Sequence, residues 1–215
     1  MATTISPPKP RSSAHPLINS SKLTKSLVFA ACLIPLGLLA YKGFTDNLGA
    51  NPIEVITRST GLWTLIFLLI TLSITPLRKL ANVPSLIKFR RMLGLFAFFY
   101  GFLHLMTFVW LDKFFDFHEM INDVYKRPFI TAGFTAFMLM VPLAITSTRK
   151  MIQRLGGKRW NTLHKLIYFS AAAGVIHFYW LVKKDITEPV QYAAVLFALL
   201  SYRAVSWISK KASRA

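Results

Sequence analysis

Residues 92–111, with the sequence MLGLFAFFYGFLHLMTFVWL, contain no Asp, Glu, Lys or Arg and a single histidine, His104. A helix of this length rises about 30 Å, which matches the hydrocarbon thickness of a bilayer. The stretch therefore predicts a membrane-spanning α-helix. His104 is the residue to explain, because an ionisable group inside hydrocarbon is costly and usually has a function.

Further apolar runs lie on both sides of this one, at residues 27–41, 61–75, 128–146, 166–182 and 189–207. Their apolar residues form continuous blocks without strand-like alternation, which disfavours a transmembrane β-barrel. We therefore predict an all-α membrane protein, a six-transmembrane-helix bundle. Pro35 predicts a bend in the first helix, and Pro142 predicts a kink in the fourth.

The charged residues divide between the two sides of such a bundle. The formal net charge is +18, and the N-terminal tail, the second and fourth connections and the C-terminus carry nineteen bases and no acid. All eight acids lie in the other connections. This is the positive-inside pattern, so we expect both termini in the cytoplasm. Basic inner loops suit anionic lipid headgroups, so the partner expected from this charge is membrane lipid and no nucleic acid.

Composition divides the chain into three parts. We expect a disordered cytoplasmic tail over residues 1–22, a transmembrane domain over 23–208 and a basic cytoplasmic tail over 209–215. Cys32 is the only cysteine, so neither an intrachain disulfide nor a cysteine-based metal site is expected. The sequence has no Cys-x-x-Cys-His motif, so any heme would be bound without thioether bonds, as b-type heme.

Two histidines share a local sequence, Gly101-Phe-Leu-His104 and Gly174-Val-Ile-His177. Counted from the nearest charged residue at the outer end, each lies about 9–12 Å deep, so the two imidazoles share one level of the membrane. A glycine three residues earlier lies on the same helical face and leaves room for a flat macrocycle. The pair predicts heme iron held by His104 and His177, with Gly101 and Gly174 packed close to the macrocycle. For either residue alone, a buried histidine that hydrogen-bonds to a neighbouring helix is the alternative.

His164 precedes His177 by thirteen residues in the same predicted helix, about 20 Å deeper toward the cytoplasm. The equivalent position on the third helix holds Arg91, so a second pair of histidines is incomplete. The alternatives for His164 and Arg91 are a second heme, a flavin site, a quinone site, or a cap at the membrane interface. His15 and His118 lie in polar segments, and we interpret both as solvated.

Guanidinium groups near a heme typically pair with its propionates. Arg58 is a candidate because it lies on the outer side, where the charge pattern gives no reason for a base. Arg91 is a second candidate because the helical face that it begins continues through Gly94 to His104, which also makes Gly94 a candidate for close packing against heme. Arg159 is a third, although ordinary inner-side charge is the simpler explanation for it.

Several short motifs follow one another at spacings typical of one family. They are Ser73-Ile-Thr75-Pro76-Leu77-Arg78, Arg90-Arg91-Met-Leu-Gly94-Leu, Gly101-Phe-Leu-His104-Leu, Arg127-Pro128, Thr146-Ser147-Thr148 and Trp160-Asn-Thr-Leu-His164-Lys-Leu-Ile-Tyr168. Over residues 51–184 the sequence resembles the heme-binding membrane subunit of the bacterial protein-methionine-sulfoxide reductase system, the MsrQ or YedZ family. The set in this order is specific, whereas any one motif alone would be weak.

The resemblance implies a six-helix, ferric-reductase-like transmembrane domain in the bacterial inner membrane. Family members carry b-type heme and are also associated with FMN, so for this chain we expect b-type heme, with one or two groups as the alternatives, and FMN. They pass electrons from the quinone pool or a cytoplasmic flavin reductase to a periplasmic molybdopterin-containing methionine-sulfoxide reductase subunit, which repairs oxidised envelope proteins. The family's intramembrane histidines fall on His104, His164 and His177. The larger related oxidases have a fourth histidine, which Arg91 replaces here.

The resemblance thus predicts an electron-transfer subunit rather than the catalytic subunit, and we assign no catalytic residue. The sequence contains no Gly-x-Gly-x-x-Gly motif, so reducing equivalents would come from another molecule. One competing hypothesis is a self-sufficient reductase of ferric iron or quinone. Another is a non-redox transporter or scaffold, which the lack of an internal repeat disfavours.

Overall fold

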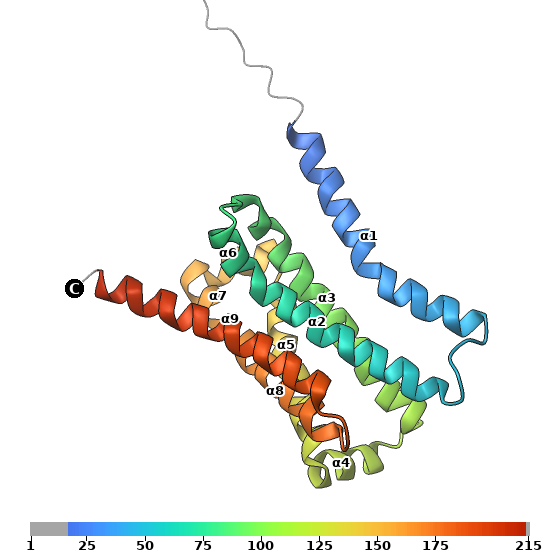
Figure 1. Ribbon diagram of the computed structural model, residues 1–215. Helices are drawn as coiled ribbons and strands as arrows, with labels where there is room; N and C mark the ends of the chain where they lie inside the picture. The colour runs from blue at the N-terminus through green and yellow to red at the C-terminus, as the bar shows by residue number, and fades with distance from the viewer. Residues whose placement is uncertain (1–16, 214–215) are drawn as a thin grey trace, which may run out of the picture.

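The computed structural model describes residues 17–213, and all of their regular structure is helical, which confirms the all-α prediction (Figure 1). The α-helices are α1 (Leu17–Phe44), α2 (Pro52–Leu80), α3 (Ile87–Met106), α4 (Phe117–Lys126), α5 (Pro128–Ile145), α6 (Arg149–Leu155), α7 (Gly157–Leu163), α8 (Leu166–Leu181) and α9 (Thr187–Ala212). A 3₁₀ turn at Pro84–Leu86 precedes α3, and a π-helical turn at Thr107–Asp112 extends it.

Among the described residues, five helices are long and apolar enough to cross a membrane. They are Lys22–Phe44, Pro52–Leu80, Pro84–Asp112, Pro128–Ile145 and Thr187–Ser209. The remaining predicted run, residues 166–182, also forms a helix, α8, but its 16 residues rise only about 24 Å. The prediction of membrane helices is therefore confirmed for five of the six runs, whereas α8 is shorter than the others.

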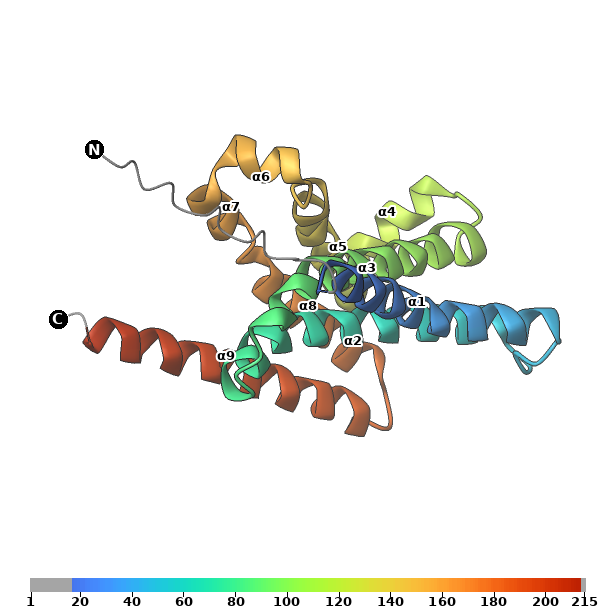
Figure 2. The ribbon, with the colours of Figure 1, turned by 90° about the horizontal axis from the view of Figure 1, so that it is seen from above.

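Two helix pairs form the body of the structure. α2 packs along α3, and α5 packs along α8, while α9 contacts both α8 and α2 (Figures 1 and 2). The core between them contains Leu68, Leu72, Ala97, Tyr100 and Ala171, which are almost fully buried. α4 lies at one end of the molecule, and α6 and α7 lie at the other (Figure 1).

The predicted tails only partly overlap the described residues. Of the N-terminal tail expected over 1–22, residues 1–16 lie outside them and 17–22 begin α1. Of the C-terminal tail expected over 209–215, α9 continues as far as Ala212. Helices extend past an apolar run because each added residue contributes another backbone hydrogen bond at little cost.

α1 is bent, as Pro35 predicted, and a side chain from α3 completes the bend (Figure 1). The Tyr100 hydroxyl donates to the carbonyl of Cys32 at 2.9 Å and accepts from the N–H of Leu36 at 3.2 Å. In a regular helix, these two backbone groups would bond to each other. Insertion of a side chain into the helical ladder is a recognised cause of a kink. Tyr100 therefore anchors α1 to the core by bonding to both of these backbone groups at the bend.

A second proline, Pro76 in α2, leaves another backbone group without its helical partner. Proline has no N–H, so the carbonyl of Leu72, four residues earlier, loses its usual donor. One terminal nitrogen of Arg203 in α9 donates to this carbonyl at 2.6 Å, and the other donates to the hydroxyl of Tyr168 in α8 at 2.7 Å. Arg203 thereby joins α9 to α2 and α8 inside an apolar region, where an unsatisfied carbonyl would be costly.

This arrangement makes a double-mutant prediction. Arg203→Met should lower the free energy of unfolding by about 2 kcal/mol, because it removes charged donors from two acceptors, one of them the buried Leu72 carbonyl. In a Pro76→Ala background the same change should cost less, since the N–H of residue 76 can then bond to Leu72. Reversible unfolding in detergent micelles would measure both costs. Equal costs in the two backgrounds would contradict the assignment.

Candidate functional site

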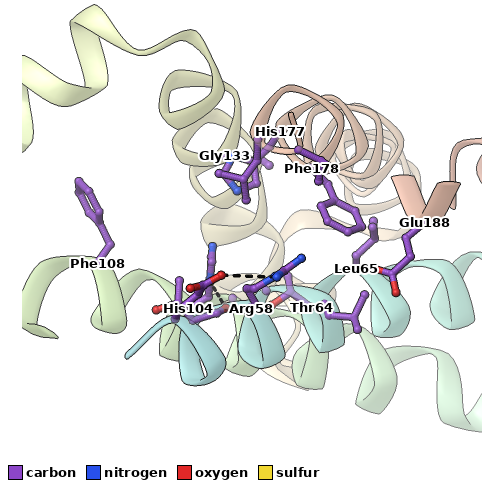
Figure 3. A pocket seen from close by; sticks show the side chains of 18 of the residues that line it. Arg58, Thr64, Leu65, His104, Phe108, Gly133, His177, Phe178 and Glu188 are labelled. Carbon is purple, nitrogen blue, oxygen red and sulfur yellow. Dashed lines mark hydrogen bonds and ion pairs between the residues drawn. The ribbon is translucent and has the colours of Figure 1, made fainter. Parts of the chain in front are cut away.

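A cavity of about 1060 Å³ opens between α2, α3, α5 and α8 at the end of the molecule that carries the acidic connections. Residues from all four helices line it, and His104 and His177 lie on opposite sides (Figure 3). Ligand pockets in proteins typically have volumes of about 300–1,000 Å³, so this one accommodates a large cofactor. Its inner wall is mostly apolar, with Leu65, Leu68 and Phe137 among its lining residues.

The structure brings the predicted histidine pair together. The ring centroids of His104 on α3 and His177 on α8 are 6.0 Å apart, with 69° between the ring planes. A bond from a metal ion to an imidazole nitrogen is about 2 Å long, and the ring centre lies roughly 1 Å beyond the nitrogen. Two imidazoles that bind one ion from opposite sides therefore have centroids roughly 6 Å apart, as observed here.

Both imidazoles are oriented by backbone carbonyls of neighbouring helices. Nδ1 of His104 donates to the carbonyl of Thr57 in α2 at 3.0 Å, and Nδ1 of His177 donates to the carbonyl of Phe129 in α5 at 2.6 Å. A carbonyl only accepts, so Nδ1 carries the proton and Nε2 of a neutral ring has a free lone pair. Histidine ligands of metal ions are commonly fixed in this way.

A glycine makes room for each of these contacts. Gly61 lies four residues after Thr57, and Gly133 lies four residues after Phe129, so each glycine is one turn beyond the carbonyl that accepts the bond. A Cβ at Gly61 would lie 3.0 Å from Cε1 of His104, and a Cβ at Gly133 would lie 2.7 Å from Nδ1 of His177. We call each unit of carbonyl and glycine a histidine seat.

The local sequences of His104 and His177 did not predict these two glycines, because both lie on the partner helices α2 and α5. The glycines predicted from the sequence take other positions. Gly101 and Gly174 line the cavity, although a Cβ at Gly174 would meet only Leu65, at 3.9 Å. Gly94 is not among the lining residues and instead faces Thr71 of α2. Single glycines inside the apolar runs of α2 and α5 were the available signal.

The mouth of the cavity is charged. Arg58 lines it, as do Lys183 and Lys184, which the sequence analysis did not single out. Arg58 pairs with Glu54 at 3.4 Å, and both side chains are largely exposed. Hydrogen bonds from Thr187 lower the pKa of Asp185, another residue of the mouth, so this carboxylate stays ionised near neutral pH.

His164 lies apart from this cavity, at the far end of α8. The prediction that it shares one helix with His177 is wrong, because α7 ends at Leu163, His164 caps that helix, and α8 begins only at Leu166. The ring stacks on Trp160 at 3.8 Å, and its Nε2 lies 3.1 Å from the hydroxyl of Thr146. These local contacts stabilise the break, so the rotation expected along a continuous helix does not apply.

The arginine near His164 is Arg90 rather than Arg91. Arg90 is half-buried and within electrostatic range of both His164 and Arg203, whereas Arg91 is exposed. Arg159, the remaining candidate, is also exposed. The sequence selected Arg91 because its spacing from His104 matches that of His164 from His177, but the break before α8 removes that equivalence.

Among residues 17–213, no three His, Cys, Asp or Glu side chains converge as they would around a bare metal ion. The described protein thus offers an ion two nitrogen ligands within a large, mostly apolar cavity. The arrangement fits a metal ion whose other coordination positions are filled by a large, flat organic ligand. A porphyrin has this form.

Comparison with known proteins gives consistent matches. The family model "Ferric reductase like transmembrane component" matches residues 59–175. The "Protein-methionine-sulfoxide reductase heme-binding subunit MsrQ" of Herminiimonas arsenicoxydans is 54% identical, over 93% of this chain and 92% of the relative. The proteins of the same name from Azospira oryzae and Rhodospirillum rubrum are 51% and 47% identical, over 86% and 92% of this chain and 79% and 95% of the relatives. No solved structure matches the chain significantly.

The histidine seats predict opposite outcomes for two similar substitutions. Gly133→Ala should lower the free energy of unfolding of the cofactor-free protein by about 1–3 kcal/mol, because the new methyl group overlaps the His177 ring. Gly174→Ala, three residues before His177, should change it little, because its methyl group would make only an ordinary contact. Thermal unfolding in detergent would compare the two variants, and similar melting temperatures would count against the seat.

Proposed function

The chain belongs to the family of protein-methionine-sulfoxide reductase heme-binding subunits and has the ferric-reductase-like transmembrane fold, and we propose that it binds b-type heme between His104 and His177. The carrying observation is the pair of imidazoles 6.0 Å apart, each with Nδ1 bound to a carbonyl and Nε2 free. The sequence relatives are named for heme binding, and the cavity has the size and apolar wall for it. Bound heme would supply one-electron redox chemistry at its iron.

The protein's own residues would set the position and electronics of the group. The carbonyls of Thr57 and Phe129 hold the two rings in the tautomer that ligates through Nε2. Gly101 and Gly174 line the cavity beside the histidines and would allow close packing of the macrocycle. The propionates would pair with the bases that line the cavity mouth, Arg58, Lys183 and Lys184. Arg159 is exposed at the opposite end of the molecule, too far away to reach them.

A second redox group would lie at the opposite, inner end of the bundle. It would contact His164 and Arg90, rather than His164 and Arg91. A single site close to one face leaves a long gap across the bilayer, so a further carrier is needed. The half-buried Arg90 beside His164 supports an anionic group there, such as heme propionates, the phosphate of FMN or a reduced quinone. Heme and these alternatives are distinguished by the experiment below.

We propose that the protein is an electron-transfer subunit of the bacterial inner membrane. It would cross the membrane six times, with the short α8 as one crossing and both termini in the cytoplasm, as the distribution of bases indicates. Electrons would come from the quinone pool or a cytoplasmic flavin reductase. They would leave the outer site for a periplasmic molybdopterin-containing methionine-sulfoxide reductase subunit, whose reaction repairs oxidised proteins.

Replacement of either ligand tests the outer site. His104→Ala and His177→Ala should each remove the Soret band of that heme and stop electron delivery to the periplasmic subunit, because one of the two imidazoles that would hold the heme is lost. His118→Ala is the control, since this exposed histidine of α4 lies outside the cavity lining. Absorption spectra of purified protein and turnover of the reconstituted pair provide the readouts. Unchanged spectra in both variants would falsify the assignment.

A matched pair of arginine variants tests the inner site. Arg90→Gln should slow reduction from the cytoplasmic side at least tenfold while leaving the outer heme in place, and Arg91→Gln should not. Heme quantitation of His164→Ala identifies the group, because halved content indicates a second heme and unchanged content indicates a flavin or quinone. Wild-type electron delivery in both Arg90→Gln and His164→Ala would contradict an inner site at these residues.

A further inference from the structure

The helix α4 has three distinct faces. Met120 and Asp123 face the protein and are buried. Asn122 and Lys126 lie on a polar face. Phe117, Ile121 and Tyr125 follow one another at four-residue spacing on a third face, with exposed fractions of 66%, 71% and 90%. A helix on the surface of a soluble protein has one face toward the protein and one toward water. A helix at a membrane surface contacts protein, water and lipid, and so has three faces.

Asp123 fixes how this helix sits on the bundle. Its carboxylate pairs with Nζ of Lys113 at 2.6 Å and with Nε of Arg127 at 3.1 Å. Lys113 directly follows the π-helical turn that ends α3, and Arg127 directly precedes α5. Lys113 also pairs with Glu119 at 2.6 Å, and its side chain is only 7% exposed. Hydrogen bonds to Asp123 and Glu119 raise the pKa of Lys113, so it remains charged.

The chain leaves α4 little freedom to move away from the membrane. Residues 113–116 separate it from the turn that ends α3, and Arg127 alone separates it from α5. Both α3 and α5 are membrane spans by length and composition. Phe114 and Phe115, in the same short connection, are exposed as well, at 77% and 52%. The apolar face of α4 is therefore held at the level where two spans leave the hydrocarbon.

We propose that Phe117, Ile121 and Tyr125 of α4 insert into the lipid of the adjacent leaflet, at the boundary between headgroups and acyl chains. Aromatic side chains are enriched at this level of membrane proteins. Transfer of such exposed apolar surface from water into lipid is favourable, whereas leaving it in contact with water is costly. The occupant is lipid rather than a protein partner because both ends of the helix are tied to membrane spans and its polar face is turned elsewhere.

The insertion has a consequence for the histidine pair. Phe129, whose carbonyl orients His177, lies two residues after Arg127, and Arg127 forms an ion pair with Asp123 of α4. A helix anchored in the leaflet and clamped to the start of α5 holds that carbonyl at a fixed depth. The depth of the cavity mouth below the surface is then set by α4 as well as by the spans.

Site-directed spin labelling tests the proposal in the full chain. Because Cys32 is the only cysteine and its carbonyl, not its thiol, bonds to Tyr100, Cys32→Ala provides a suitable background. Ile121→Cys and Phe117→Cys place a nitroxide on the apolar face, and Lys126→Cys places one on the polar face as the matched control. The protein is reconstituted in vesicles of phosphatidylethanolamine and phosphatidylglycerol.

We expect the labels at residues 117 and 121 to collide at least threefold more with oxygen, relative to a water-soluble nickel chelate, than the label at residue 126. Two apolar-face positions keep the test decisive if one variant folds poorly. Equal access of the chelate to both faces would overturn the proposal. So would protection of the apolar face that appears only when the periplasmic partner is added, because the occupant would then be protein.

Discussion

An imidazole buried in a membrane needs a partner for each nitrogen, and this need governs the half of the structure that contains the cavity. His104 and His177 each bond through Nδ1 to a carbonyl that already belongs to a helix. Such a carbonyl is accessible to a ring only where the next turn has no side chain, which Gly61 and Gly133 provide. The two seats require α3 to lie against α2 and α8 to lie against α5, which are the two closely packed pairs of the fold. Orientation of the rings and pairing of the helices are therefore one constraint.

The same need for hydrogen-bond partners explains the contacts around the prolines of α1 and α2. Hydrocarbon supplies no hydrogen bonds, so each backbone group released by a proline or a bend must find a partner in the protein. Around Pro35 the partner is Tyr100, and beside Pro76 it is Arg203. Each partner comes from another helix, so the irregular points of α2 and α1 become contacts between helices. Arg203 also shows that a base near the end of the bundle opposite the cavity can be a structural donor and need not be loop charge.

The sequence predicted those features that follow from the residues of each apolar run and from their distance to its charged ends. The apolar runs became helices, and the histidines at matched depth, His104 and His177, came together. Features that depend on a neighbouring segment were missed: the glycine seats lie on the partner helices, and no pattern within the run of either histidine points to them. The break at His164 was missed because one of the contacts that stabilise it comes from Thr146, at the end of α5, while Trp160 of α7 stacks on the other side of the turn. That break brings Arg90, rather than Arg91, close to it. α4 was missed because ten residues of mixed polarity resemble a loop.

The two ends of the bundle differ in charge balance, and the difference bears on the direction of electron flow. At the end of the bundle that carries the cavity, bases have acids beside them, as in the pair Arg58–Glu54 at the cavity mouth and the pair Lys113–Asp123 under α4. Near His164 the bases Arg90, Arg203 and Arg78 lie close together, and the segments around them contain no acid. Uncompensated positive charge in a medium of low dielectric stabilises an added electron or an anionic carrier. Under the proposed function, the inner end therefore favours uptake of reducing equivalents, and the neutralised outer end favours their release.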